Sequence, residues 1–141
     1  MSCIFCKIVT REAKASKVYE DDMILAFMDI HPVREGQVLV IPKGHTDHFS
    51  DLDDNVATQI FLQAQRISRT IKKVLSPERV GLVVHGYGVP HAHMVVVPQN
   101  DENDITSGRM STIENGEVVF TMKNLPLVSH EELERVAEML R

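Results

Sequence analysis

The feature that most constrains the fold is a long run with helical spacing in the middle of the chain. From about Leu52 to Leu75, apolar residues recur at intervals of three and four, which is the spacing of one face of an amphipathic helix. Acidic residues stand at its start and a basic cluster at its end, as the helix dipole favours. The apolar positions are Val56, Ile60, Ala64, Ile67, Ile71 and Val74. The run therefore predicts one long helix.

Short runs with strand composition precede this helix. "KVYED" and "ILAFMDI" are β-like and are separated by Asp21-Asp22, which predicts a hairpin. "QVLVIP" predicts a third strand, closed by Pro42.

More strands follow the helix. "RVGLVVHG" and "HAHMVVVP" predict two strands joined by the tight "GYG", and a further hairpin is expected around "ENGE". The chain closes with a second helix, for which Ser129 and Glu132 form a capping-box pattern. The order of elements predicts an α+β fold with a mainly antiparallel sheet.

Length and charge exclude several classes of protein. The 141 residues suit a single domain, 1–141, that can bury a core without disulfides. The net charge of −5 argues against a nucleic-acid binder, since the nearest basic cluster falls at the predicted helix end. No apolar run is long enough for a membrane span, and the N-terminal "MSCIFCKIVTRE" does not resemble a signal peptide. We therefore expect a cytoplasmic protein, in which two cysteines are thiols or metal ligands rather than a disulfide.

The strongest chemical signal is the stretch "GVPHAHMVVVPQ", residues 88–99. In a strand, alternate side chains share a face, so His91, His93, Val95 and Val97 should point one way and the residues between them into the core. Two imidazoles roughly 7 Å apart along a strand can address one ligand or one metal. The alternative is a pair of structural histidines.

An imidazole can also act as a nucleophile toward phosphorus. Its neutral form attacks and splits one displacement into two easier steps. The neutral tautomer must be fixed by a hydrogen bond at the other ring nitrogen, often to a backbone carbonyl. For His93, either His91 or the turn before it could supply that bond.

The sequence resembles the histidine triad (HIT) superfamily, whose pattern is His-x-His-x-His followed by apolar residues. The stretches "CIFCKIV", "VYEDD", "LAFMDIHPVREGQVLVIPKGH" and "VPHAHMVVVP" match it in order and spacing over residues 3–98, which leaves residues 99–141 as a C-terminal extension. The resemblance implies a five-stranded antiparallel sheet with two helices, commonly in a homodimer. It also implies hydrolysis or transfer of nucleotides through a nucleotidyl-histidine, on a phosphoanhydride or a phosphoramidate.

The resemblance assigns roles to individual residues. His93 resembles the nucleophile and His91 the first triad histidine, while Asp29 resembles the carboxylate that holds the ribose hydroxyls. Phe27 resembles the aromatic residue of the base pocket, and further apolar residues would complete a slot for the base. These are Ile4, Phe5, Ile8 and Ile30, with plain core packing as the alternative reading.

The chain departs from the family pattern in two places. Val95 stands where the third triad histidine is expected. In addition, the loop before the triad is short: its strand ends in His85, counted here with the nucleotide-binding residues, and Tyr87 and Gly88 stand where the better-known branch carries a glutamine and a serine. These departures concern the phosphate and the leaving group more than nucleotide binding.

Cys3 and Cys6 form a C-x2-C knuckle, which is half of a zinc site. In bacterial members of the family the site is completed by the histidine of "PK-x-H" and by a triad histidine, which here would be His45 and His91. His48 is the alternative third ligand, whereas His31 and His130 are expected on the surface. Two free thiols are the competing interpretation.

Three functions remain open at this point. The leading one is a nucleotide hydrolase or transferase acting through His93, with a structural zinc. The second is a nucleotide-binding module weakened in catalysis by Val95, and the third is a zinc-stabilised scaffold that works by interaction alone.

Overall fold

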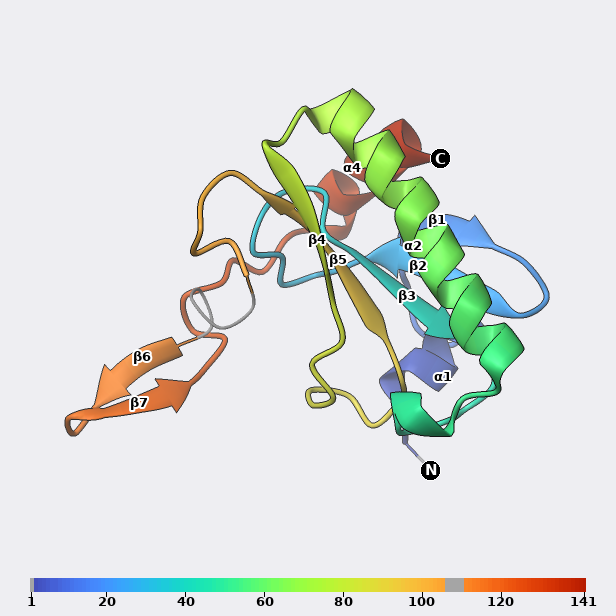
Figure 1. The fold of residues 1–141 in the computed structure, drawn as a ribbon, viewed down its shortest axis with the longest axis horizontal. Helices are drawn as coiled ribbons and strands as arrows, with labels where there is room; N and C mark the ends of the chain where they lie inside the picture. The colour runs from blue at the N-terminus through green and yellow to red at the C-terminus, as the bar shows by residue number, and fades with distance from the viewer. Residues whose placement is uncertain (1, 106–110) are drawn as a thin grey trace.

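The computed structural model describes residues 2–105 and 111–141 and shows a five-stranded antiparallel sheet with helices on both of its faces. The strand order is β1-β2-β3-β5-β4, with a separate two-stranded ribbon of β6 and β7 (Figure 1). The predicted α+β class with an antiparallel sheet is confirmed. The elements are α1 (Ile4–Val9), β1 (Lys17–Glu20), β2 (Ile24–Met28), β3 (Val38–Pro42), a 3-10 turn (Phe49–Asp51), α2 (Asp54–Leu75), β4 (Arg79–Val83), β5 (Met94–Gln99), β6 (Ser111–Glu114), β7 (Glu117–Phe120) and α4 (His130–Leu140).

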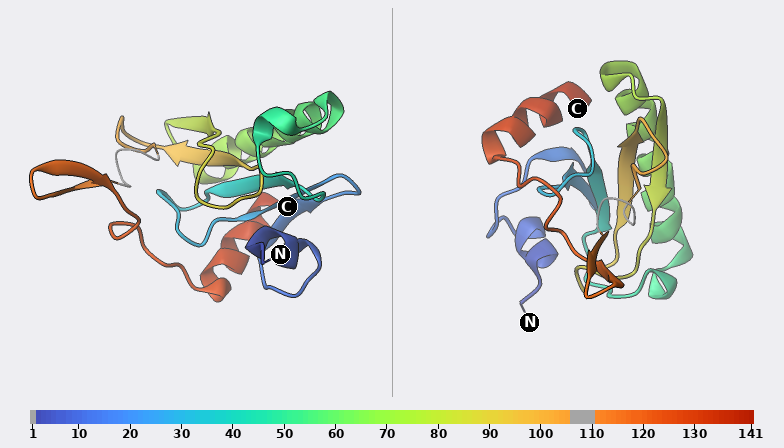
Figure 2. Two further views of the ribbon diagram at one scale, coloured as in Figure 1. Left: turned by 90° about the horizontal axis from the view of Figure 1, so that it is seen from below. Right: turned by 90° about the vertical axis from the view of Figure 1, so that its left-hand side faces the viewer.

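The long helix α2 and the terminal helix α4 cover one face of the sheet. Helix α2 lies over β3, β4 and β5, and α4 lies over β1 and β2 and contacts α2 (Figure 2). The predicted apolar stripe of α2 faces the sheet, and Ile60, Ala64 and Ile71 are fully buried there. Ser129 is the N-cap of α4, and its side chain accepts a hydrogen bond from the backbone N–H of Glu132 at 3.2 Å, which is one of the two bonds of the predicted capping box.

The other face of the sheet is covered by the short helix α1. Strand β5 alternates between the two faces, because Met94 and Val96 pack with α2 whereas Val95 and Val97 pack in the cluster that includes Phe5 of α1. Both sets of side chains are buried. The alternation predicted for this strand is therefore confirmed, but the side chains on both of its faces are buried, each set in a different apolar cluster.

The two histidines precede strand β5 instead of lying within it. The expected strand begins at His91, whereas the observed strand begins at Met94. The preceding strand ends at Val83 and not at His85, so residues 84–93 join the two strands in place of the tight "GYG" turn that was expected. The backbone N–H of His91 bonds to the carbonyl of Val89 at 2.8 Å, and that of Ala92 to the carbonyl of Thr46 at 2.7 Å. These bonds take the place of the regular hydrogen bonds between strands, so the backbone before β5 is fixed without being part of the sheet.

The hairpin expected around "ENGE" is present as β6 and β7. Asn115 and Gly116 have φ angles of 52° and 80°, the positive values that a two-residue hairpin turn of this kind requires. The ribbon stands away from the main sheet (Figure 1). It exposes Ile113 and Val118 by 73% and 79%.

An ion pair ties the loop after β2 to the turn after β5. Arg34 Nε lies 2.6 Å from Asp104 Oδ2, and Asp104 is fully buried. The same carboxylate oxygen accepts the backbone N–H groups of Asn100 and Asp101 at 2.8 and 3.2 Å. The loop between β2 and β3 is thereby anchored at its midpoint.

No helix within residues 2–105 and 111–141 is both long enough and apolar enough to cross a membrane.

Candidate active site

His91 is fully buried, and both of its ring nitrogens face a defined partner. Nε2 lies 2.8 Å from the carbonyl oxygen of Pro42. Because a carbonyl can only accept, Nε2 carries the proton and Nδ1 presents its lone pair. Burial, more than the neighbouring imidazoles, lowers the pKa of His91, although the bond to Pro42 opposes this. Burial therefore favours the neutral imidazole, in which the lone pair of Nδ1 faces the two cysteine sulfurs.

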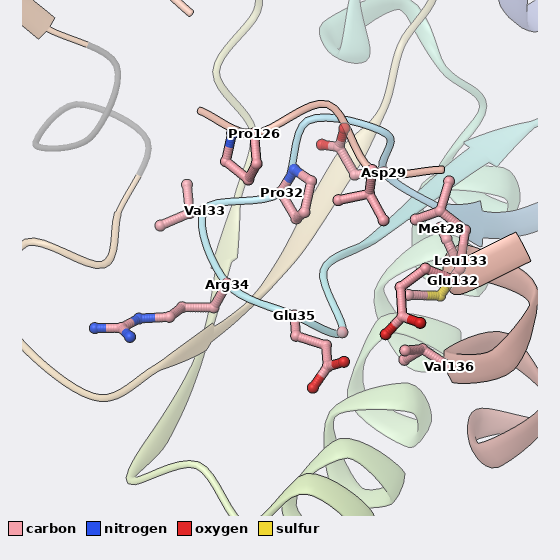
Figure 3. A pocket seen from close by; sticks show the side chains of 12 residues that line it. Met28, Asp29, Pro32, Val33, Arg34, Glu35, Pro126, Glu132, Leu133 and Val136 are labelled. Carbon is pink, nitrogen blue, oxygen red and sulfur yellow. The ribbon is translucent and has the colours of Figure 1, made fainter. Parts of the chain in front are cut away.

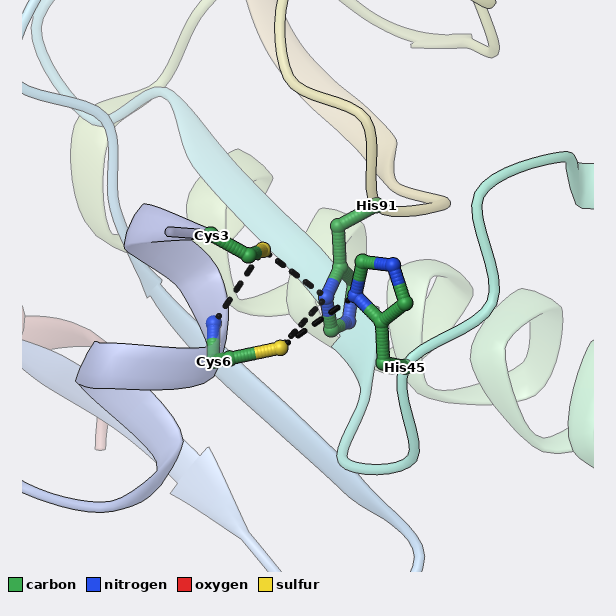
Figure 4. A group of neighbouring side chains, drawn as sticks. All are labelled: Cys3, Cys6, His45 and His91. Carbon is green, nitrogen blue, oxygen red and sulfur yellow. Dashed lines mark hydrogen bonds between the residues drawn. The ribbon is translucent and has the colours of Figure 1, made fainter. Parts of the chain in front are cut away.

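The free Nδ1 of His91 points into a cluster with Cys3, Cys6 and His45 (Figure 4). It lies 3.5 Å from Cys3 Sγ and 3.6 Å from Cys6 Sγ, and His45 Nδ1 lies 3.2 Å from Cys6 Sγ. All four ligand atoms lie within 4.8 Å of one another.

These distances fit one tetrahedral cation. Zn–S bonds of about 2.3 Å and Zn–N bonds of about 2.0 Å give a sulfur–nitrogen edge of about 3.5 Å. The bond from His91 Nε2 to Pro42 is the kind of support that orients a metal-ligating histidine. Among the residues described, His45 and not His48 completes this cluster. The hydrogen bond to Pro42 uses Nε2 and leaves Nδ1 for a cation, so the two interactions can fix His91 together.

The two cysteines sit at the start of α1. The sulfur of Cys3 caps the helix by accepting the backbone N–H of Cys6 at 3.4 Å. Burial, followed by the neighbouring Cys3 side chain, raises the pKa of the Cys6 thiol. A cation in the cluster would displace the proton of this thiol, so cation binding is linked to proton release.

His93 is oriented by the backbone of His91. Its Nδ1 lies 2.7 Å from the carbonyl oxygen of His91, so Nδ1 carries a proton, and in the neutral ring the lone pair is on Nε2. The ring is half-buried and meets Phe5 edge-on, with ring centroids 5.4 Å apart. The group that fixes His93 is thus the backbone of a residue in the cysteine–histidine cluster.

Val95 offers no polar group beside His93. It pairs with Leu39 and Val83 in the sheet and is 6% exposed. It belongs to the same apolar cluster as Phe5 and Phe27. An imidazole at this position would need a partner inside that cluster.

The apolar residues expected around the base divide into two groups. Phe5, Ile8 and Phe27 are buried, and Phe5 and Phe27 meet edge to face at 5.4 Å. Ile4 and Ile30 are 48% and 42% exposed. The first group is the core beneath α1, and only the second group can contact a ligand with a large part of its surface.

Asp29 follows β2 and has a donor on each carboxylate oxygen. Oδ1 accepts the backbone N–H of His31 at 2.9 Å, and Oδ2 accepts Nε2 of Gln37 at 2.7 Å. The sequence did not single out Gln37. No local pattern marks Gln37, because its place opposite Asp29 follows from the register of β2 and β3.

His85 lies on the surface, among other exposed aromatic side chains. Its ring stacks on Phe120 of β7 with centroids 5.1 Å apart and meets Tyr87 edge-on at 6.2 Å. Tyr87 is 80% exposed. Phe120 also escaped the sequence analysis, because its contact with His85 joins two distant segments.

His31 and His130 were expected on the surface, and they differ. His130 is exposed, whereas His31 is half-buried and its Nδ1 has no hydrogen-bond partner among the residues described.

A hollow of about 180 Å³ lies between the loop after β2 and α4 (Figure 3). Its lining is mainly apolar and includes Met28, Pro32, Leu133 and Val136. Met28 and Leu133 belong to the core on the α2 side of the sheet. The hollow contains none of the histidines, but Asp29 is one of its lining residues, so it adjoins the loop that carries this carboxylate.

Comparison with known proteins gives the same family from the sequence and from the fold. Residues 10–102 match the HIT domain family. The protein named hit of Bacillus subtilis is 36% identical over 108 residues, which cover 73% of this chain and 74% of that protein. The adenosine 5'-monophosphoramidase of Schizosaccharomyces pombe is 34% identical over 108 residues, covering 72% of this chain and 77% of the relative.

Two solved structures are similar over nearly the whole chain. A Hit-like protein of Bartonella henselae has a TM-score of 0.79 and 27% identity, covering 99% of this chain and 94% of the other. A zinc-bound histidine triad family protein of Mycobacterium smegmatis has a TM-score of 0.73 and 28% identity, with the same coverage. The similarity therefore extends past the matched domain into the C-terminal part.

Proposed function

Because this chain belongs to the HIT family, we propose that it is a nucleotide hydrolase or nucleotidyl transferase that works through His93. The observation that carries the proposal is the fixed tautomer of His93, whose Nδ1–H is committed to the carbonyl of His91. A nucleophilic imidazole needs this arrangement, because the attacking nitrogen must keep its lone pair. The substrates are nucleotides with a phosphoanhydride or a phosphoramidate bond.

The reaction proceeds in two displacements. Nε2 of His93 attacks the α-phosphorus, a nitrogen–phosphorus bond forms, and the bond to the leaving group breaks with its electron pair going to that group. Water, or the hydroxyl of another acceptor in a transfer reaction, then attacks phosphorus and loses its proton to solvent. The nitrogen–phosphorus bond breaks with its electron pair returning to Nε2, which releases the nucleoside monophosphate or the transfer product. The carbonyl of His91 stabilises the ring while it carries positive charge.

The nucleoside binds along the β2 side of the site. The carboxylate of Asp29 accepts the ribose hydroxyls, with one acceptor position left on each oxygen beside the protein donors. The base lies against Ile4 and Ile30, the exposed members of the apolar set, over a floor of Phe5, Ile8 and Phe27. His85 lies two residues beyond the end of β4, in the segment that leads to the histidines.

The cluster of Cys3, Cys6, His45 and His91 would hold a structural zinc. Four protein ligands close the coordination sphere, so the ion would supply folding energy and a fixed position for His91. The zinc-bound protein of Mycobacterium smegmatis supports this choice of metal. We expect about one zinc per chain when the protein is purified without chelators and analysed for metals. Free thiols that serve as ligands suit a reducing compartment such as the cytoplasm.

The single domain spans residues 1–141 in this proposal, with α4 packed on the sheet as an integral part. The exposed side chains of Ile113 and Val118, which face each other on the ribbon, support a homodimer that covers them.

A second candidate is a nucleotide-binding module with weak catalysis. Val95 favours it, because a buried valine supplies no proton to a leaving group. Turnover separates the two candidates, since both bind nucleotides.

The test of the proposal replaces the nucleophile. His93→Asn keeps a polar side chain but removes the attacking imidazole, so hydrolysis of an adenosine phosphoramidate or an adenylated anhydride should fall by at least about 10³-fold while binding of adenosine monophosphate persists. The matched control is His130→Asn, at an exposed histidine of α4. Turnover near the wild-type rate in His93→Asn would contradict the assignment.

A further inference from the structure

Gln37 lies opposite Asp29, just after the end of β2 and just before the start of β3. The register pairs Met28 with Val38, and the backbone N–H of Asp29 donates to the carbonyl of Gln37 at 3.0 Å, which extends the ladder by one step. The Gln37 residue is only 3% exposed. A buried amide has to find partners within the protein, and Gln37 finds them in the loop that carries Asp29.

The orientation of the Gln37 amide is determined by what it contacts. The backbone N–H of Val33 lies 2.8 Å from Oε1, and because a backbone N–H can only donate, this atom must be the amide oxygen. The amide nitrogen then faces Asp29 and donates to Oδ2 at 2.7 Å. Both ends of the amide are therefore committed, and a flipped amide would place oxygen against oxygen.

This contact pins the carboxylate of Asp29 from one side, and the backbone N–H of His31 pins it from the other at 2.9 Å. A carboxylate oxygen accepts about two hydrogen bonds. Each oxygen of Asp29 thus keeps one acceptor position, and the plane in which the two positions lie is fixed. Two neighbouring hydroxyls of a ribose present two donors to match them.

We propose that Gln37 is a positioning residue that sets selectivity for ribose over deoxyribose; the inference rests on the proposed binding of nucleotides through Asp29. A carboxylate held in one orientation loses no freedom when both hydroxyls bind. Without the Gln37 donor, the carboxylate turns about its side-chain bonds, and a second hydroxyl gains less. Gln37 acts through Asp29 and touches no reacting atom.

The test compares two substitutions that treat the amide differently. Gln37→Glu keeps an oxygen for the N–H of Val33 but replaces the donor to Asp29 by a second carboxylate. Gln37→Met keeps the length of the side chain and removes both bonds. Gln63→Met is the matched control, because Gln63 is a buried glutamine on α2, away from the loop.

The measured quantity is the ratio of dissociation constants for 2'-deoxyadenosine monophosphate and adenosine monophosphate. A hydroxyl donating to a charged acceptor is worth about tenfold or more in affinity, so the wild type and Gln63→Met should show a ratio of about 10 or above. In both Gln37 variants the ratio should fall below about 3. A purely structural role would lower the melting temperature and leave the ratio unchanged in the folded protein.

The outcomes are separable. A retained ratio in folded Gln37→Glu or Gln37→Met overturns the role of Gln37 and leaves the proposed function standing. Failure of the wild type to bind adenosine monophosphate overturns the proposed function and this inference together. If neither variant folds, the wild type decides: the side-chain amide resonance of Gln37 should shift with adenosine monophosphate and much less with its 2',3'-dideoxy analogue, and equal shifts overturn the inference.

Discussion

The two faces of the main sheet are covered by helices of very different size. On one face lie α2 with 22 residues and α4 with 11, which bury a continuous apolar cluster. On the other lies α1 with six residues, over a second cluster that contains Cys3, Phe5 and Val95. His93 and the cysteine–histidine cluster are on the α1 side, since both His91 and His93 contact Phe5.

The helices on the two faces are therefore stabilised by different interactions. A helix of six residues is too short to be stable alone in water, whereas α2 is stabilised by the apolar face that it buries. The contacts of Cys3 and Cys6 with His45 and His91 fasten α1 to segments far along the chain. Substitutions that remove contacts on the face covered by α2 and α4 should therefore lower stability alone. Substitutions that remove contacts on the α1 face should lower both stability and nucleotide affinity.

The largest effect is expected from removing the two thiols. Cys3→Ser with Cys6→Ser takes away half of the ligand set, releases α1 and frees His91, whose carbonyl orients His93. We expect the metal to be lost, the free energy of unfolding to fall by roughly 5 kcal/mol or more, and the affinity for adenosine monophosphate to fall with it. Metal analysis, thermal unfolding and calorimetric titration measure the three quantities. A stable double variant that binds the nucleotide normally would remove the distinction between the faces.

A cavity on the opposite face provides the contrast. Ile71 of α2 is fully buried in the core between the sheet and helices α2 and α4. Ile71→Ala should lower the free energy of unfolding by about 2–5 kcal/mol through lost apolar contact and an unfilled cavity. Metal content and the dissociation constant for adenosine monophosphate should match the wild type when measured well below the melting temperature. Weakened nucleotide binding in this variant would show that packing on the α2 side affects the site on the α1 side.

A smaller effect is expected at Val95, where the chain departs from the family pattern. Because this position is buried, Val95→His should cost roughly 1–3 kcal/mol of stability unless the ring finds a partner. A histidine here can assist a leaving group, and general acid assistance is typically worth about 10²–10⁴-fold in rate. The variant should therefore raise kcat/KM for a phosphoramidate with a poor amine leaving group more than for an activated phenol ester.

The ratio of the two kcat/KM values is the measurement, and Val95→Thr is the control because it adds a small polar group of the same shape without an imidazole. An unchanged ratio in folded Val95→His would mean that position 95 does not reach the leaving group.

The parts of the structure that followed from the sequence are those with a local or a family signal. The spacing of apolar residues predicted α2, Ser129 and Glu132 predicted the start of α4, and "ENGE" predicted the ribbon. The family resemblance, and not the knuckle alone, brought Cys3 and Cys6 together with histidines 45 and 91, and the structure places all four side by side.

The remaining features depend on which strands are neighbours, and a periodic pattern does not contain that information. Alternation showed that Val95 and Met94 face opposite ways, but not that both faces are covered. The late start of β5 comes from the bond between Ala92 and Thr46, and the link from Gln37 to Asp29 comes from strand register. The stack of His85 on Phe120 joins segments that the sequence gives no reason to pair.

The most direct test of the central claim is to look for the covalent intermediate on His93. The protein is mixed with an adenylated substrate, quenched in alkali within one turnover, digested and analysed by mass spectrometry, since a nitrogen–phosphorus bond to imidazole is lost in acid. The account predicts an adenylyl group on the peptide that contains His93, with fragment ions that place it on that ring and no adduct in His93→Asn. Turnover without any such adduct on rapid quenching, or an adduct on a different side chain, would contradict the account.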